Sequence, residues 1–417
     1  MTSNAISNNT NTIKPVWLNI AVIVAALGNF VDTYDLVLFS VVRIKSLKEL
    51  GLSGQALTDD GIILLNMQMF GMLVGGILWG ILGDKRGRLS VLFGSIFMYS
   101  AANVANAFVY SVETYALWRF IAGVGLAGEL GAGITLVTEI LPKEKRGYGA
   151  MIVAAVGLLG AVAAVFISKI FDWRTSYIIG GVLGFLLLFL RVSVRESQMF
   201  SHSQEKTNEH GNFFMLFKNK KRLLRYLSCI LAGLPTWYVI GILVTFSPEF
   251  GKVLKINGEV EAPIAVLLIY GGGAIGDLLS GYISQILKSR LKVLVLFVLM
   301  DLVFVVIYHC LQGIDVNYFY IIFFFFGIGS GFWVMLITIA AEQFGTNIRA
   351  TVTTTVPNFV RAMIIPITAL FNLFRGQVDF FYASILVGII CFGLSLLASR
   401  LLNETFSEDL DYIEGAK

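Results

Sequence analysis

The sequence predicts an all-α membrane protein in which twelve transmembrane helices form two pseudo-symmetric bundles of six. Three observations support this fold class: the composition, a series of long apolar runs, and a repeat between the two halves. Of the 417 residues, 57% are hydrophobic and only 14% are charged, and the mean hydropathy is +0.79. Because about a quarter of the residues in a soluble domain are charged, the composition indicates an integral membrane protein.

Apolar runs of about 20 residues, the length that crosses a bilayer, recur along the chain. The first six are predicted at 16–42, 61–83, 89–109, 115–140, 148–170 and 175–192. The second six are predicted at 223–249, 262–287, 291–311, 316–343, 350–374 and 380–402.

A charged stretch separates these two sets of helices. We therefore assign residues 1–192 to an N-terminal bundle, 193–222 to a cytoplasmic linker, and 223–417 to a C-terminal bundle with a cytoplasmic tail. Inside the linker, the apolar sequence FFMLF at 213–217 is expected to lie flat on the membrane surface.

Lysine and arginine predict the orientation in the membrane. The side that holds both termini and the linker carries 21 of them, and the opposite loops carry 8. Since cytoplasmic loops are enriched in these residues, both termini are expected in the cytoplasm. The sequence RIKSLKEL at 43–50, read as an outer loop, runs against this trend.

The two halves repeat at a nearly constant distance. Three glycines of the first half recur 201 residues later: Gly71, Gly75 and Gly80 match Gly272, Gly276 and Gly281. Glu139 and Arg146 match Glu342 and Arg349, each 203 residues later. The spacing indicates two copies of a six-helix unit, and glycines so spaced let helices approach closely.

Two motifs make the repeat more specific. The sequence GILGDKRGRLS, with Gly80, Gly83, Asp84, Gly87 and Arg88, resembles the signature loop of the major facilitator superfamily. The sequence RFIAGVGLAGELG resembles the arginine-and-glycine motif of its fourth helix: it contains Arg119, Gly123, Gly125, Gly128 and Glu129. The resemblance implies two parallel repeats about an axis along the membrane normal.

Within the superfamily, Gly128-Glu129 followed by TEILPKEKRG resembles the metabolite:proton symporter branch, next to the sugar porters. The sequence departs from those patterns in three places. The expected Glu-Ser-Pro after the sixth helix is Glu196-Ser197-Gln198, and the second signature loop has Gln285 in place of an aspartate. The seventh helix lacks the paired glutamines of sugar porters, which weakens the interpretation that the substrate is a sugar.

Two carboxylates interrupt the first predicted helix. Asp32 and Asp35 are three residues apart and share one face of the helix. The resemblance implies that, in proton-coupled relatives, the aspartate after the tyrosine of the first helix pairs with the arginine of the fourth helix. In this sequence these residues are Asp35 and Arg119. A cation favours the ionised carboxylate and burial favours the protonated form, so conformational change could load and release a proton. The alternative is a permanent ion pair; Asp32 is a second proton site or lines the vestibule.

Two further charges lie inside predicted helices. Glu129 is either another proton site or a hydrogen-bonding residue of the helix packing. Arg361 lies between Pro357 and Pro366, which are expected to let the eleventh helix bend. Its guanidinium suits a substrate carboxylate; the alternative is an ion pair with Asp277 or Asp301.

Aromatic residues complete the predicted substrate site. Trp237, Tyr238 and Trp333 lie where this fold usually forms pocket walls, but for any single aromatic residue lipid contact or core packing is the favoured explanation. The predicted substrate-binding set is therefore Arg361, Arg119, Tyr238, Trp237, Trp333 and Asp277.

A third group of charges lies at the cytoplasmic helix ends. The resemblance implies an ionic latch that closes the inner side, with the alternative that these residues only anchor helices at the headgroups. Its members are Asp84, Arg88, Glu139, Arg146, Glu342 and Arg349.

Together these features favour a proton-driven symporter that imports a small organic anion or zwitterion. Alternatives are an exporter or importer of a polycarboxylate siderophore or drug, a sugar or amino-acid symporter, and a sensor that does not transport. The fifth helix lacks the proline of exporters, and the absence of a phosphate-binding GxxxxGK[ST] loop argues against ATP drive. We expect a monomer that is not an enzyme, with no metal, cofactor or nucleic-acid partner.

Overall fold

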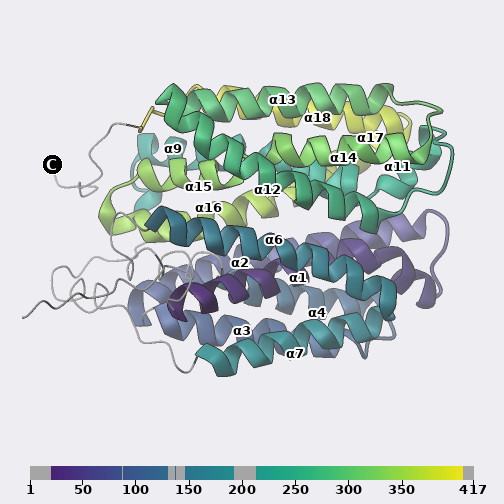
Figure 1. The fold of residues 1–417 in the computed structure, drawn as a ribbon, viewed down its shortest axis with the longest axis horizontal. Helices are drawn as coiled ribbons and strands as arrows, with labels where there is room; N and C mark the ends of the chain where they lie inside the picture. Colours follow the sequence, from purple (N-terminus) through teal and green to yellow (C-terminus); the bar gives the residue numbers. More distant parts are fainter. Residues whose placement is uncertain (1–19, 87, 130–136, 138–145, 192–212, 407–417) are drawn as a thin grey trace, which may run out of the picture.

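The computed structural model describes residues 20–86, 88–129, 137, 146–191 and 213–406 (Figure 1). Their backbone is helical, apart from turns, loops and an isolated bridge between Asn257 and Asp315.

The N-terminal half contains six long helices. They are α1 (Ile20–Glu49), α2 (Ala56–Arg86), α3 (Arg88–Asn106), α4 (Val112–Leu126), α6 (Arg146–Ile170) and α7 (Trp173–Arg191).

The C-terminal half begins with a short 3-10 helix, η3 (Phe213–Leu216). The next predicted span comprises α9 (Lys220–Ala232), α10 (Leu234–Tyr238), the π-helix η4 (Val239–Val244) and α11 (Ser247–Val253). The remaining helices are α12 (Ala262–Leu287), α13 (Arg290–Cys310), α14 (Val316–Ser330), α15 (Trp333–Glu342), α16 (Thr346–Ala362), α17 (Ile364–Arg375) and α18 (Phe380–Ser399).

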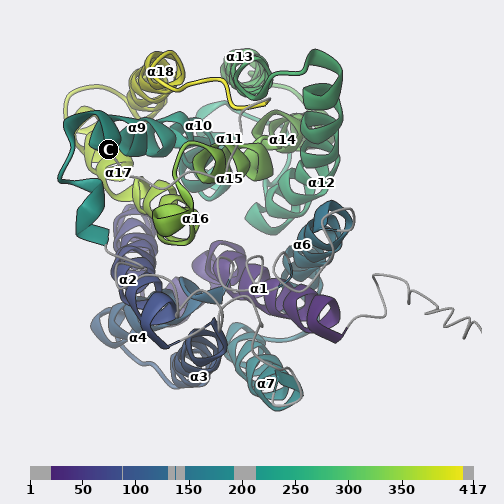
Figure 2. The ribbon, with the colours of Figure 1, turned by 90° about the vertical axis from the view of Figure 1, so that its left-hand side faces the viewer.

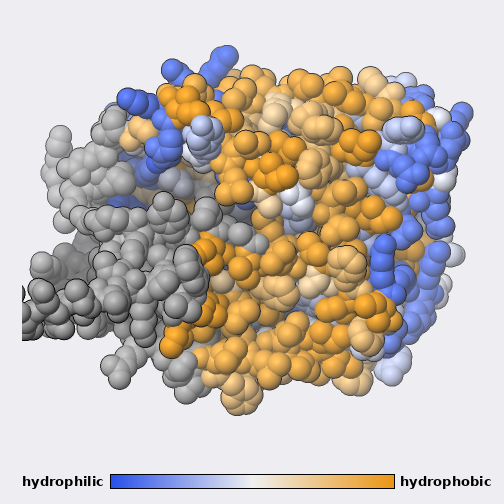
Figure 3. All heavy atoms as spheres, viewed as in Figure 1, coloured by the Kyte–Doolittle hydropathy of each residue, from blue (hydrophilic) through white to orange (hydrophobic). Residues whose placement is uncertain are grey.

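The helices form two bundles that lie side by side, one from each half of the chain (Figure 2). Each of the predicted spans contains helical backbone. Within the described ranges, nine helices are long and apolar enough to cross a membrane. The visible face carries a broad apolar band, and hydrophilic residues gather at the end away from the chain's C-terminus (Figure 3).

The repeated glycines serve the same packing role in both bundles. A Cβ added to Gly71 of α2 would lie 2.1 Å from the carbonyl oxygen of Phe120 in α4. A Cβ added to Gly272 of α12 would lie 2.0 Å from the carbonyl oxygen of Phe324 in α14. Both distances are too short for any side chain, so the helix backbones touch at matching positions of the two repeats.

One expectation from the sequence was wrong, and another stays a prediction. The charged sequence at 43–50 is not a loop, because α1 continues through Glu49 and Arg43 is fully buried. The FFMLF sequence forms η3, in which Phe213 is buried with ring contacts to Tyr226 and Phe359, while Phe214 and Phe217 are exposed. The predicted linker therefore ends earlier, since α9 already begins at Lys220.

Candidate transport site

Two buried carboxyl groups lie in the middle of α1. Asp32 and Asp35 are each 1% exposed, and none of their four carboxyl oxygens has a hydrogen-bond partner within the described residues. A buried polar group without a partner costs several kcal/mol, and an ionisable one inside a membrane span usually has a function. These two side chains are therefore the strongest indication of a functional site.

Asp35 lies inside the N-terminal bundle. A Cβ added to Gly180 of α7 would be 2.6 Å from its Oδ1, so the close approach of α7 depends on that glycine. Asn103 of α3 lies nearby, but neither its amide nor the Asp35 carboxylate has a partner at hydrogen-bond distance.

Arg119 of α4 is the predicted partner of Asp35. It is fully buried and donates hydrogen bonds to Gln68 Oε1 and to the Tyr177 hydroxyl, the latter at 3.4 Å. Its guanidinium also lies 5.0 Å from the ring centroid of Phe39. Asp35 is near enough for the two charges to interact, but they form no ion pair. The structure thus brings the two residues together without the predicted contact.

Asp32 faces the other half of the protein. Its charge interacts with that of Arg361 on α16 and with that of Glu129, which lies just beyond α4 and is 1% exposed. Tyr270 of α12 also lies within electrostatic reach of both Asp32 and Arg361. Opposite charges of the two halves therefore lie within electrostatic reach of each other, without a direct ion pair.

Arg361 lies one residue before the end of α16. Helix α16 ends at Ala362 and α17 begins at Ile364, and the backbone of Met363 between them keeps helical dihedral angles, so the predicted bend stays a prediction. Arg361 is 6% exposed, its Nη1 donates to Asn358 Oδ1 at 3.5 Å, and its guanidinium lies 5.8 Å from the ring centroid of Trp333. Its Nε has no hydrogen-bond partner among the described residues, so the guanidinium retains donor capacity.

Trp333 reaches the site because its own transmembrane segment is interrupted. Helix α14 ends at Ser330 and α15 begins at Trp333. At the break, a Cβ on Gly331 would lie 2.3 Å from backbone atoms of Gly276, which shows how closely α12 approaches.

Tyr238 and Asp301 make their hydrogen bonds within the C-terminal bundle. Tyr238 is fully buried in the C-terminal bundle, where its hydroxyl donates to the Ser384 carbonyl oxygen at 2.9 Å. Asp301 does not pair with Arg361 but accepts a hydrogen bond from Ser330 at 3.1 Å. Trp237 of α10 is buried, with no partner for its Nε1 among the described residues, and Asp277 of α12 is half-buried.

The predicted cytoplasmic latch is only partly visible. Glu139 and the side chains of Asp84, Arg88 and Arg146 lie outside the described residues. Glu342 pairs with Arg290 at 3.4 Å and accepts a hydrogen bond from Thr405 at 2.6 Å, both within the C-terminal half. Arg349 donates from Nε to the carbonyl oxygens of Ala341 and Phe344.

Three neutral residues of the site were not predicted from the sequence. Gln68 and Tyr177 hold the Arg119 guanidinium, and Asn358 supports Arg361 while donating to the Ala127 carbonyl oxygen at 2.9 Å across the two halves. The sequence could have indicated Gln68, which is an amide inside an otherwise apolar helix, and Asn358, which is an amide three residues before Arg361. No feature of the sequence indicates Tyr177.

The fold and this interface define a secondary transporter, in which a substrate site between two bundles opens alternately to each side. The chain belongs to the Major Facilitator Superfamily, whose family model matches residues 18–369. It is a multi-pass integral membrane protein and not an enzyme. The structure matches that of a D-xylose-proton symporter with a TM-score of 0.69 over 94% of this chain and 99% of the other, at 16% sequence identity. At that identity the match shows the shared fold alone.

Curated relatives are transporters of small metabolites. The chain is 23% identical to a gentisate transporter of Corynebacterium glutamicum over 83% of this chain and 80% of that protein. It is 25% identical to a sialic acid transporter of Escherichia coli over 60% of both chains, and 29% identical to a niacin transporter of Acinetobacter baylyi over 42% of this chain and 39% of that protein. The chain thus spans less than two thirds of the length of some relatives it matches.

Proposed function

We propose that this protein is a proton-coupled symporter that imports a small carboxylate-bearing metabolite across the bacterial inner membrane, with both termini in the cytoplasm. One observation carries the proposal: Asp32 and Asp35 are buried on α1 without hydrogen-bond partners, within electrostatic reach of the buried Arg361 and Arg119 respectively. A buried carboxylate and a nearby guanidinium provide a proton acceptor and an anion binder.

Arg361 is the proposed anion-binding residue. A guanidinium binds a carboxylate through two parallel hydrogen bonds, and this one retains an unused Nε donor. The relatives described above support this class, because gentisate, sialic acid and niacin all carry a carboxyl group.

Asp35 is the proposed proton carrier, and Asp32 is the second candidate. Protonation of Asp35 would remove the negative charge that attracts Arg119, and protonation of Asp32 would remove the one that attracts Arg361. Either change would weaken the attraction between the carboxyl group and its arginine. Because a ligand or proton shifts an equilibrium only through its differential affinity for the two states, substrate and proton together would favour the inward movement.

Uptake into proteoliposomes tests the proposal. The purified protein is offered labelled organic acids, amino acids and sugars, with and without an inward proton gradient. We expect a carboxylate to accumulate only when the gradient is present. Equal accumulation with and without the gradient would exclude proton coupling. Accumulation of sugars alone would exclude a carboxylate as the substrate.

A further inference from the structure

A buried ion pair joins the two halves at their outer end. Arg43, near the end of α1, is fully buried, and its Nη2 lies 2.9 Å from Oε1 and 3.0 Å from Oε2 of Glu249 in α11. The same nitrogen donates to the Thr245 carbonyl oxygen at 3.1 Å, and Nη1 donates to the Leu57 carbonyl oxygen at 3.0 Å. One guanidinium thus binds backbone or side-chain oxygens of both halves.

A second ion pair joins the halves in the reverse sense. Arg375, at the end of α17, pairs with Asp59 in the first turn of α2. In the first pair the arginine belongs to the N-terminal half, whereas in the second it belongs to the C-terminal half. Each pair joins one arginine to one carboxylate and is therefore neutral, so both pairs can form without a bound counter-ion.

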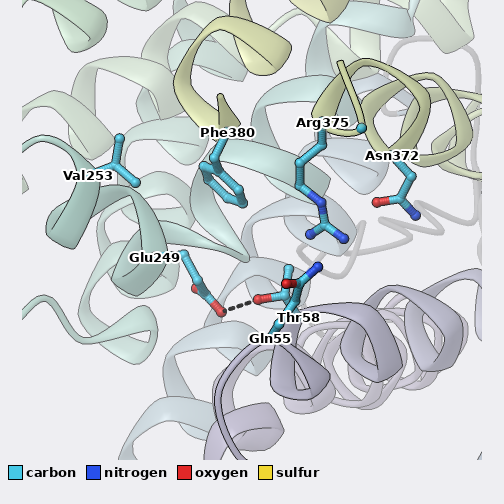
Figure 4. Close-up of a pocket in the computed structure, with 8 residues that line it drawn as sticks. Gln55, Thr58, Glu249, Val253, Asn372, Arg375 and Phe380 are labelled. Atoms are coloured by element: carbon cyan, nitrogen blue, oxygen red, sulfur yellow. Dashed lines mark hydrogen bonds between the residues drawn. The ribbon is translucent and has the colours of Figure 1, made fainter. Parts of the chain in front are cut away.

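One residue of each pair, Glu249 and Arg375, lines the same surface cavity. It has a volume of about 470 Å³ and is lined in part by Gln55, Thr58, Glu249, Asn372 and Arg375 (Figure 4). Thr58 of α2 also lies within hydrogen-bond distance of Glu249, at 3.4 Å. Both halves therefore supply polar side chains to the floor of this outer depression.

Neutral contacts continue the closure below the ion pairs. The hydroxyls of Ser40 and Thr245 lie 3.2 Å apart, and Asn66 donates to Thr368 Oγ1 at 2.9 Å. Each of these hydrogen bonds joins one residue of the N-terminal half to one of the C-terminal half. Neutral hydrogen bonds thus join the two halves in addition to the two ion pairs.

We propose that Arg43–Glu249 and Arg375–Asp59 form an outer latch, which holds the transporter closed to the outside and must separate before substrate enters. Opening would leave Arg43 without Glu249 and without the Thr245 carbonyl oxygen. Removing one partner of a buried charge pair is strongly unfavourable, so the latch biases the protein toward the outward-closed state. The proposal rests on alternating access but not on the substrate or the proton.

Thiol accessibility tests the latch independently of transport. The three native cysteines are replaced by serine or alanine, and Ser40→Cys is introduced as a reporter below the ion pairs. A membrane-impermeant thiol reagent is then applied from outside to right-side-out vesicles. We expect Glu249→Gln to raise the modification rate by about tenfold or more, because the two-state equilibrium moves toward the outward-open form. The matched control is Glu259→Gln, an exposed carboxylate in the same outer region, which should leave the rate within about twofold.

Distances between spin labels separate a global opening from local loosening. Labels at Ser53 and Gln377 occupy exposed positions after α1 and α17, on opposite halves. A longer distance in Glu249→Gln, and to a smaller extent in Asp59→Asn, supports the latch. An unchanged distance and an unchanged modification rate in both variants would overturn it. If Glu249→Gln does not fold, Asp59→Asn gives the same readout at the more exposed pair. Neither measurement depends on the transported molecule, so the latch and the proposed function can fail separately.

Discussion

Asp32 and Asp35 lie three residues apart on α1, yet their carboxyl groups interact with arginines of different halves. The charge of Asp32 interacts with that of Arg361 in the C-terminal half, and the charge of Asp35 interacts with that of Arg119 in its own half. With 3.6 residues per turn, positions three apart diverge by roughly 60° around the helix. This divergence lets one helix present a carboxylate to the domain interface and another to the bundle interior.

The first prediction concerns Asp35→Asn. Asparagine keeps the shape of the side chain but cannot bind or release a proton at neutral pH. We therefore expect gradient-driven accumulation to fall to background while exchange of labelled for unlabelled substrate continues at a rate within about threefold of the wild type. Both quantities are measured in the same proteoliposomes.

Asp32→Asn is the matched comparison for that experiment. If Asp32 is the proton carrier instead, this variant will lose accumulation and keep exchange while Asp35→Asn transports normally. Loss of both activities in folded Asp35→Asn would indicate that Asp35 only stabilises the helix packing.

The second prediction concerns Arg361→Lys. Lysine keeps the positive charge but lacks the planar pair of donors that binds a carboxylate. Loss of one charge-assisted hydrogen bond corresponds to about 1.5–3 kcal/mol, so we expect the KM for uptake to rise by about tenfold or more. Arg400→Lys, at an exposed position after α18, is the control and should leave the KM unchanged. An unaltered KM in Arg361→Lys would remove Arg361 from the substrate site.

The third prediction concerns Asn358→Ala. This variant removes the hydrogen bond to the Ala127 carbonyl oxygen and the contact with Arg361. Because Arg361 loses its neighbour but remains present, we expect a KM increase of about three- to tenfold, smaller than in Arg361→Lys. Uptake kinetics measure the effect, with Asn403→Ala at an exposed position after α18 as the control. A KM as high as that of Arg361→Lys would mean that Asn358 binds substrate itself.

The fold was predictable because each of its signals is local or periodic. Long apolar runs gave the helices, and glycines repeated 201 residues apart gave the two copies, which the structure explains by matching backbone contacts at Gly71 and Gly272. The buried acids of α1 were found because a charge inside an apolar run is conspicuous in composition alone.

The interface between the halves was less predictable, because its contacts join residues more than 200 positions apart. Arg43 was counted as a loop charge, since sequence does not show that α1 extends through Glu49 or that Glu249 meets it. The ring contacts of Phe213 with Tyr226 and Phe359 were not predictable for the same reason, because tertiary packing supplies them.

The last prediction compares two adjacent glycines of α12. A Cβ on Gly272 would lie 2.0 Å from the Phe324 carbonyl oxygen, whereas a Cβ on Gly271 would have no heavy atom within 4 Å. Gly272→Ala must therefore push α12 and α14 apart, and we expect a loss of about 1–3 kcal/mol in stability, as for other overpacked sites. Gly271→Ala should be neutral or stabilise by up to about 1 kcal/mol, because alanine favours the helix. Thermal unfolding in detergent measures both, and equal melting temperatures for the two variants would contradict the proposed helix contact.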